Sequence, residues 1–298
     1  MKQLPTKNLF ILFLTALIWG TAFVAQSVGM DHIGPFAFNA ARSFVGGIAL
    51  IPVILLFDRI QSKEVKQEKP SNSRVLLLGG LCCGVALGVA SCLQQVGIKY
   101  TTVGKAGFIT ALYIIIVPIL GLFLKQKVGV KLWCSVVIAM IGLYLLCMTG
   151  SLTLQKGDLL VLLCAFAFSV HIMVIDHFSP MVDGVRMSCI QFFVAGILST
   201  VAMLLWEGAP QPHNLFISWM PILYAGVLSS GVAYTLQIIG QRGVNPTIAS
   251  LILSLESVIS AISGWLLLGQ SMSLREISGC ALMFLSIILA QLPEIRRR

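Results

Sequence analysis

The chain has 298 residues, of which 57% are hydrophobic and 10% are charged, and its formal net charge is +9. Soluble domains contain about 45–50% apolar and about 25% charged residues, so this composition excludes an ordinary soluble domain. The positive charge does not indicate a nucleic-acid partner, because the lysines and arginines lie mostly between long apolar segments and form no basic face.

Ten apolar segments follow one another along the chain, and each is close to the roughly 20 residues that a helix needs to cross a bilayer. In chain order they cover residues 9–28, 36–57, 75–98, 106–124, 132–155, 159–175, 187–206, 215–241, 244–268 and 277–293. Two of them hold a charged residue, Arg42 in the second and Glu256 in the ninth. The sequence therefore predicts an all-α integral membrane protein with ten transmembrane helices.

The first apolar segment does not resemble a cleaved signal peptide, because it has span length and further apolar segments follow it. With a cytoplasmic N-terminus, the outer side of the membrane holds Lys99, Lys105, Lys156 and Arg275, and the cytoplasmic side holds the many other basic residues outside the spans. This positive-inside bias predicts a bacterial inner (plasma) membrane protein with both termini in the cytoplasm.

One apolar sequence segment occurs twice in the chain. GVASCLQQVG at 88–97 and GVAYTLQIIG at 231–240 agree at six of ten positions, with an offset of 143 residues, and each contains a glutamine. Upstream, an offset of 149 residues places Gly47 on Gly196. These matches predict an internal duplication.

The duplication divides the chain into residues 1–150 and 151–298, with five predicted spans in each and one membrane domain formed by both. An odd number of spans forces the second copy to start from the opposite face of the membrane. We therefore expect two inverted five-helix repeats, an architecture that recurs in secondary transporters and places the substrate between the repeats.

Three groups of residues resemble the motifs of a known family. They are IWGTAF at 18–23, LQQVG at 93–97 followed by GKAGFIT at 104–110, and LSLES at 253–257 followed by GWLLLG at 264–269. On these motifs the chain resembles, over nearly its whole length, the EamA-type transporters of the drug/metabolite transporter (DMT) superfamily. The resemblance implies ten helices in inverted repeats and transport of a small organic solute, often export. The family commonly has Glu where this chain has Gln270, so no role is carried over to that position.

Glu256 is the strongest candidate for a functional residue, because a charge at the centre of a membrane helix costs about 2.5–3.5 kcal/mol on insertion scales. It either binds a cationic group or carries a coupling proton, or it is a protonated or serine-bonded structural residue. Leu251, Leu255 and Val258 lie on another side of the same predicted helix, and we expect that side to face lipid.

Two further ionisable residues lie within predicted spans. Arg42 either binds an anion, assisted by Asn39 on the same helix face, or extends its side chain to the membrane surface. His171 either shuttles protons or is a hydrogen-bonded structural residue.

Amides and aromatic rings complete the candidate site. Gln94 and Gln95 of the third span, and Tyr234 and Gln237 of the eighth, must find polar partners inside the membrane, which are either a cavity or a neighbouring helix. We expect Gln94 and Gln237 to face each other across the pseudo-two-fold axis and to point into a central cavity. Trp19 and Tyr113 are candidate cavity walls, although aromatic packing alone also accounts for them.

The sequence predicts a secondary transporter that moves a small organic solute, such as an amino acid, a metabolite or a drug-like compound, by alternating access. Proton coupling through Glu256 and facilitated exchange are both open. The expected partners are the solute, the lipid bilayer and, as a further option, a second copy in a homodimer. We expect no cofactor or metal, because the cysteines form no Cys-x-x-Cys pair and no ATP-binding P-loop pattern occurs.

An integral membrane enzyme acting on a lipid or isoprenoid substrate is the alternative. Its nearest candidate residues are Asp176, His177 and Asp183, which fall at or just after the end of the sixth predicted span. A solvated loop accounts for these three residues more simply.

Overall fold

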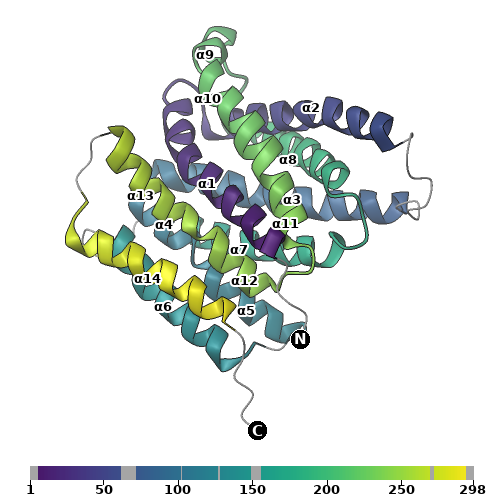
Figure 1. The fold of residues 1–298 in the computed structure, drawn as a ribbon. Helices are drawn as coiled ribbons and strands as arrows, with labels where there is room; N and C mark the ends of the chain where they lie inside the picture. Colours follow the sequence, from purple (N-terminus) through teal and green to yellow (C-terminus); the bar gives the residue numbers. More distant parts are fainter. Residues whose placement is uncertain are drawn as a thin grey trace.

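The computed structural model of the chain describes residues 6–61, 72–101, 103–126, 128–148, 156–268 and 272–292, and within these ranges all regular elements are helices (Figure 1). They are α1 (Thr6–Gly29), α2 (Pro35–Gln61), α3 (Ser73–Lys99), α4 (Val103–Thr110), α5 (Tyr113–Phe123), α6 (Val130–Cys147), α7 (Lys156–Phe178), α8 (Gly184–Trp206), α9 (Pro212–Ile217), α10 (Trp219–Leu223), η1 (Tyr224–Tyr234), α11 (Thr235–Gln241), α12 (Pro246–Leu253), α13 (Leu255–Leu268) and α14 (Leu274–Gln291). Gln270 lies outside the described residues.

The described helices confirm the predicted class of all-α membrane protein. Nine segments are long and apolar enough to cross a bilayer. The expected first span appears as a shorter apolar stretch, Thr6–Ala22, within α1. The count of ten spans therefore stays a prediction.

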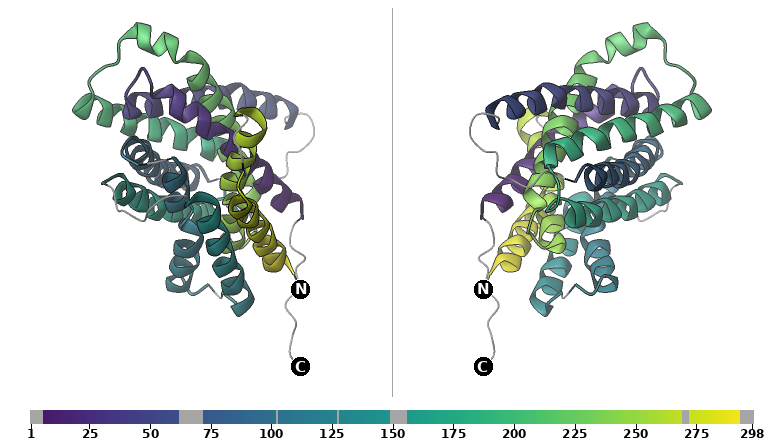
Figure 2. Two further views of the ribbon diagram at one scale, coloured as in Figure 1. Left: turned by 90° about the vertical axis from the view of Figure 1, so that its left-hand side faces the viewer. Right: turned by 90° about the vertical axis from the view of Figure 1, so that its right-hand side faces the viewer.

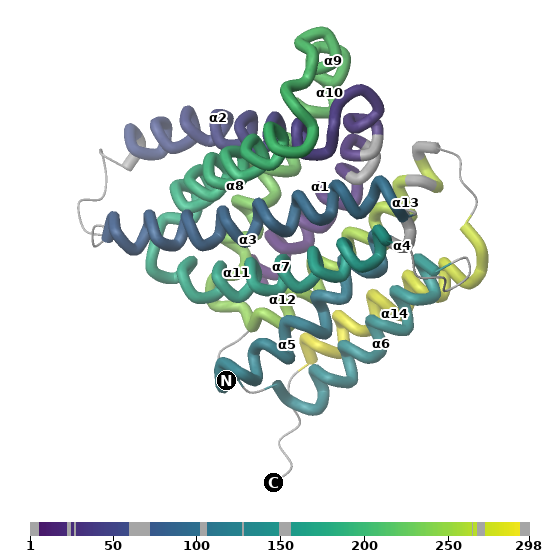
Figure 3. The backbone as a smooth tube through the Cα atoms, turned by 180° about the vertical axis from the view of Figure 1, so that it is seen from behind, coloured from purple at the N-terminus to yellow at the C-terminus, as the bar shows by residue number. Residues whose placement is uncertain are grey.

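The long helices are stacked side by side. Figure 3 shows α2, α8, α3 and α7 in this order, with α6 paired to α14 beyond them. The side views in Figure 2 place the green α9 and α10 at one end of this arrangement and the teal α5 and α6 at the other. The helix α12 and the first part of α13 are buried, and the two helices contact α1, α5 and α6.

The helices α2 and α8 run antiparallel over their whole length. Near one end, Asn39 Nδ2 donates to Ser199 Oγ at 2.8 Å, and at the other end Arg186 Nη2 pairs with Asp58 Oδ1 at 2.6 Å. Residue numbers thus rise along α2 as they fall along α8, and hydrogen bonds join the pair near both of its ends.

Glycines allow α3 to approach α8 closely. Gly80, Gly84 and Gly88 are spaced four residues apart and face α8, and a Cβ added at Gly84 would lie 2.5 Å from Val194 Cβ and 2.8 Å from the carbonyl oxygen of Gln191. Small residues at such spacing are typical of helix contacts in membranes, where dispersion between close backbones replaces the hydrophobic effect.

Two of the spans are interrupted near their middle. The helix α4 ends at Thr110 and α5 begins at Tyr113, while α12 ends at Leu253 and α13 begins at Leu255. Each interruption leaves backbone groups outside the regular helical hydrogen bonds, which membrane proteins tolerate only where protein or a water-filled cavity surrounds them. Tyr113 and Glu256 lie in the first turn after the two interruptions.

A π-helix, η1, forms the middle of the segment that contains the second copy of the repeated sequence. Its backbone hydrogen bonds run from residue i to i+5, a form that is rare beyond a single turn and is often found at functional sites. It carries Ser229 and Tyr234 into the protein interior.

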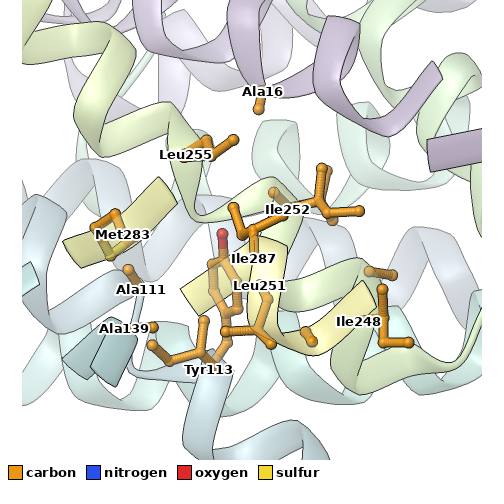
Figure 4. Packing of buried hydrophobic residues seen from close by; sticks show 14 of the residues in the cluster. Ala16, Ala111, Tyr113, Ala139, Ile248, Leu251, Ile252, Leu255, Met283 and Ile287 are labelled. Carbon is orange, nitrogen blue, oxygen red and sulfur yellow. The ribbon is translucent and has the colours of Figure 1, made fainter. Parts of the chain in front are cut away.

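The expectation that one side of the ninth span faces lipid is wrong for the first part of the span. Leu251, Leu255 and Val258 are 1%, 2% and 0% exposed, and all three belong to the largest hydrophobic core cluster, part of which is shown in Figure 4. Leu266, further along the same side, is 65% exposed, as expected. Apolar side chains suit lipid and protein packing equally well in a membrane. Polarity along the helix therefore did not distinguish a lipid-facing side from a buried one.

We predict that Gly84→Ala destabilises the protein by roughly 1–3 kcal/mol, the usual cost of overpacking a tight contact. Gly107→Ala is the matched control, because no atom lies within 4 Å of a Cβ added there. Thermal unfolding in detergent, followed by tryptophan fluorescence, should show a lower Tm for Gly84→Ala and an unchanged or higher Tm for Gly107→Ala. Equal shifts for the two variants would contradict the close approach of α3 and α8.

Candidate functional site

A polar cavity lies among the central helices of the described structure. The residues that line it come from α1, α2, α3, α4, α5, α7, η1, α11, α12 and α13, and they are Trp19, Gln26, Arg42, Gln94, Thr110, Tyr113, Phe168, Ile172, Ser229, Tyr234, Gln237, Leu253 and Glu256. The space that the centres of water-sized molecules can occupy between them is about 40 Å³. This is room for a few water molecules, so the helices must move apart before an organic solute can enter.

Most of the residues predicted from the sequence line this cavity, namely Trp19, Arg42, Gln94, Tyr113, Tyr234, Gln237 and Glu256. Asn39, Gln95 and His171 do not. The sequence did not single out Gln26, Thr110, Phe168, Ile172 or Ser229, whereas Leu253 lies on the same predicted helix stripe as Glu256. Gln26 carries the same signal as the other glutamines, an amide within an apolar segment, whereas the apolar members of this set carry none.

Glu256 meets Tyr113 at the point where the two interrupted spans come together. The Tyr113 hydroxyl donates to Glu256 Oε1 at 3.3 Å, and Glu256 is 7% exposed. Figure 4 shows the Tyr113 ring standing among Leu251, Ile252 and Ala139, with its hydroxyl oxygen at the far end from the backbone. Glu256 Oε2 has no hydrogen-bond partner among the described residues, so the carboxyl group retains acceptor capacity on the cavity side.

Arg42 is held by a buried polar network. Its Nε donates to Asn39 Oδ1 at 2.8 Å, and the Asn39 amide donates in turn to Ser91 Oγ at 3.1 Å and to Ser199 Oγ at 2.8 Å. The Arg42 side chain is 4% exposed, so it does not extend to the surface. Within the described part of the chain, its Nη atoms donate no hydrogen bond, which leaves both available to an anionic group in the cavity.

Tyr234 is enclosed by aromatic rings. The Trp19, Phe192 and His171 rings have centroids 4.5, 5.6 and 5.9 Å from the Tyr234 ring. Trp19 Nε1 donates to the carbonyl oxygen of Ser229 at 3.3 Å, which ties α1 to the π-helix. This enclosure holds the Tyr234 side chain in one orientation at the cavity wall.

His171 and Gln95 are buried outside the cavity. His171 Nε2 lies 3.1 Å from Gln191 Oε1, so the ring takes part in a buried hydrogen bond behind Tyr234. Gln95 is 0% exposed, and neither atom of its amide has a partner among the described residues. Neither residue lines the cavity described above.

Gln94 and Gln237 both line the cavity, from α3 and α11. Gln94 Nε2 donates to Thr110 Oγ1 at 3.3 Å. Gln237 Oε1 is buried and has no partner within the described ranges. A buried amide oxygen without a partner is rare in folded proteins, and an unseen water or solute is a usual reason.

The three candidate residues of the alternative enzyme hypothesis, Asp176, His177 and Asp183, each contact a different neighbour. Asp176 Oδ2 accepts from Gln126 Nε2 at 3.2 Å, and Asp183 caps α8 by accepting from the Arg186 backbone N–H at 2.8 Å. The His177 ring packs edge-on against Phe178. The described residues contain no cluster of three or more His, Cys, Asp or Glu side chains that could hold a metal ion.

Comparison with known proteins connects this chain to membrane transport. The model of the EamA-like transporter family matches residues 6–148 and 155–292. An uncharacterized transporter of Archaeoglobus fulgidus is 28% identical over 282 residues, which are 94% of this chain and 84% of that protein. The uncharacterized inner membrane transporter YedA of Escherichia coli (strain K12) is 20% identical, with 95% of this chain and 90% of that protein covered.

The fold also matches a solved crystal structure. The TM-score is 0.76 at 19% sequence identity, and the match covers 96% of this chain and 98% of the other. At this identity the likeness concerns the fold alone.

We predict that Asn39→Ala destabilises the protein by roughly 1.5–3 kcal/mol, because it removes the acceptor for the buried Arg42 Nε. Asn39→Asp keeps an acceptor for Arg42 and should lose less stability. Asn214→Ala, a partly exposed position in α9, is the control. Thermal unfolding in detergent gives the ranking, and an Asn39→Ala protein as stable as the control would show that the network does not hold Arg42.

Proposed function

Because the chain belongs to the EamA-like transporter family, we propose that it is a secondary transporter that moves a small organic solute across the membrane by alternating access. The solute binds in the cavity lined by Arg42 and Glu256, and the two halves of the chain expose this cavity to each side in turn. The chain is a multi-pass membrane protein, and no step of the proposed cycle uses a cofactor.

Ten membrane helices in two inverted repeats are part of this proposal. The same family model matches residues 6–148 and, separately, 155–292, which supports a duplication. At the offset of 149 residues, Phe44 corresponds to Phe193 and Gly47 to Gly196. A Cβ added at Gly196 would lie 3.0 Å from the Phe44 ring, and one added at Gly47 would lie 3.1 Å from the Phe193 ring. Reciprocal contacts of this kind are expected across a two-fold axis.

A second pair of contacts is repeated between other helices. A Cβ added at Gly97 would lie 2.5 Å from Val161, and one added at Gly240 would lie 3.0 Å from Leu12. Gly97 corresponds to Gly240 at the offset of 143 residues, and Leu12 to Val161 at 149. The contact between α3 and α7 is thus reproduced between α11 and α1. Since the equivalent helices α2 and α8 are antiparallel, the axis that relates the halves lies across them, as in an inverted repeat.

Tyr113 and Glu256 are also equivalent positions, because they are 143 residues apart, and they contact each other. Two equivalent residues can meet only near the axis. The cavity therefore lies between the proposed repeats, where secondary transporters bind their substrates.

The charges of the cavity support a solute class. Arg42 offers donors to an anionic group, and Glu256 offers an acceptor to a cationic one. Phe168, Ile172 and Leu253 supply apolar surface beside them. On this combination we propose that the solute has an ammonium group, an acidic group and an apolar part. Amino acids and similar metabolites have all three.

The proposed membrane is the bacterial inner membrane, with both termini in the cytoplasm. The bias of basic residues in the sequence supports this orientation, and the relative YedA is named as an inner membrane protein. We propose export as the direction on the family resemblance, and a homodimer as an assembly to be tested by mass measurement in detergent.

The test of the proposed function is solute exchange in proteoliposomes. Each of the common amino acids is compared with the amine that lacks its carboxylate and with the acid that lacks its amine. We expect the amino acid to be exchanged and both analogues to be poor substrates. Arg42→Gln and Glu256→Gln should each lower kcat/KM about tenfold or more, since each removes a charge-assisted hydrogen bond worth roughly 1.5–3 kcal/mol. Arg74→Gln and Asp31→Asn, at exposed positions, are the controls.

The same assay separates proton coupling from facilitated exchange. If Glu256 carries a coupling proton, an imposed pH gradient drives uptake in the wild type and not in Glu256→Gln. If exchange is facilitated, a pH gradient drives neither protein. Unchanged, equally pH-dependent transport by Glu256→Gln would end the coupling hypothesis.

A further inference from the structure

An arginine that follows the end of α11 joins several helix ends. Arg242 Nε donates to the carbonyl oxygen of Ser179 at 2.8 Å, and its Nη2 donates to that of Val182 at 2.7 Å. Its own carbonyl oxygen accepts from Asn8 Nδ2 at 2.6 Å. Arg242 thus joins the turn between α7 and α8 to the ends of α11 and α1.

The residue before Arg242 makes a further contact between helices. Gln241 is 0% exposed, and its Nε2 donates at 3.3 Å to the carbonyl oxygen of Ile172, a residue that lines the cavity. This hydrogen bond joins α7 to α11 between the cavity residue Ile172 and Arg242.

The equivalent contact is absent at the opposite end. Lys99 corresponds to Arg242 at the offset of 143 residues, and Met30 and Ile33 correspond to Ser179 and Val182 at 149. Lys99 is exposed and makes no hydrogen bond or ion pair among the described residues. The cavity reaches towards this end, since Gln26 and Gln94 line it within two turns of the ends of α1 and α3.

This difference does not reflect a general loss of the repeat. Glu207 Oε2 accepts from the Ala37 backbone N–H at 3.0 Å, and the equivalent pair, Asp58 and Arg186, joins the other ends of α2 and α8 at 2.6 Å. A carboxylate that follows α8 therefore binds the start of α2, and a carboxylate near the end of α2 binds the start of α8. The contacts between α2 and α8 are thus present at both ends, whereas the contacts of Arg242 have no counterpart at Lys99.

We propose that Arg242 and Lys99 are alternating latches of the two ends of the cavity: when Arg242 releases Ser179 and Val182, Lys99 binds the backbone carbonyls of Met30 and Ile33. The proposal rests on the inverted repeat of the proposed function. The carbonyls just after α1 and α7 suit a cation, because the end of a helix has unpaired carbonyl groups and a partial negative charge.

The two latches have opposite effects on the same equilibrium. Loss of Arg242 weakens only the state closed at its own end, and loss of Lys99 weakens only the other state. The populations are measured by distances between pairs of spin labels carried on genetically encoded unnatural residues, so that the native cysteines stay in place. One pair, at Lys7 and Met181, spans the Arg242 end, and the other, at Asp31 and Tyr100, spans the Lys99 end.

In full-length protein in lipid nanodiscs without added solute, Arg242→Ala should shift the population roughly tenfold or more towards a longer Lys7–Met181 distance and a shorter Asp31–Tyr100 distance. Lys99→Ala should shift both distances in the opposite sense, and the double variant should return towards the wild type. Arg74→Ala and Lys156→Ala, which each remove an exposed cation at the same two ends, should leave both distances unchanged.

Unchanged distances in Arg242→Ala, or shifts of the same sign in the two latch variants, would overturn the proposal. The measurement needs no transport. If the distances respond as expected while no solute is exchanged in proteoliposomes, the latches stand and the proposed function fails. If solute is exchanged and the distances do not respond, the latches fail alone.

Discussion

A charge inside the hydrocarbon region must be stabilised by protein, because no water is there to solvate it. Arg42 meets this requirement through Asn39, whose amide is itself held by Ser91 and Ser199. Glu256 meets it in part through Tyr113. Both groups keep hydrogen-bonding capacity that the described residues do not use, and both line the same cavity.

The helices that carry the charges are fixed by close packing. Glycine positions such as Gly84 bring backbones into contact, and the hydrogen bonds near both ends of the α2–α8 pair hold its register. In the proposed alternating access, we expect the rearrangement to occur between such pairs of helices, at contacts like those of Arg242.

The membrane class could be predicted because uncharged runs of span length have no other stable environment. The residues of the cavity could be predicted only in part. Gln94 and Gln95 carry the same signal, an amide in an apolar segment, but they are neighbours on a helix and only Gln94 lines the cavity. The buried side of α12 and α13 was misjudged because leucine suits lipid and protein alike. The helix interruptions beside Tyr113 and Glu256, and the π-helix, depend on tertiary contacts that no local pattern records.

A pair of fused repeats has a freedom that a symmetric dimer lacks. In a homodimer every substitution appears twice, so an arginine beside the axis would face a second arginine. At the offsets of the proposed repeat, the position equivalent to Arg42 is Gln191, and the position equivalent to Glu256 is its own partner, Tyr113. In the proposed duplication, joining the two copies in one chain lets one half supply the arginine and the other the glutamate. The proposed site would then give a bound solute a preferred orientation.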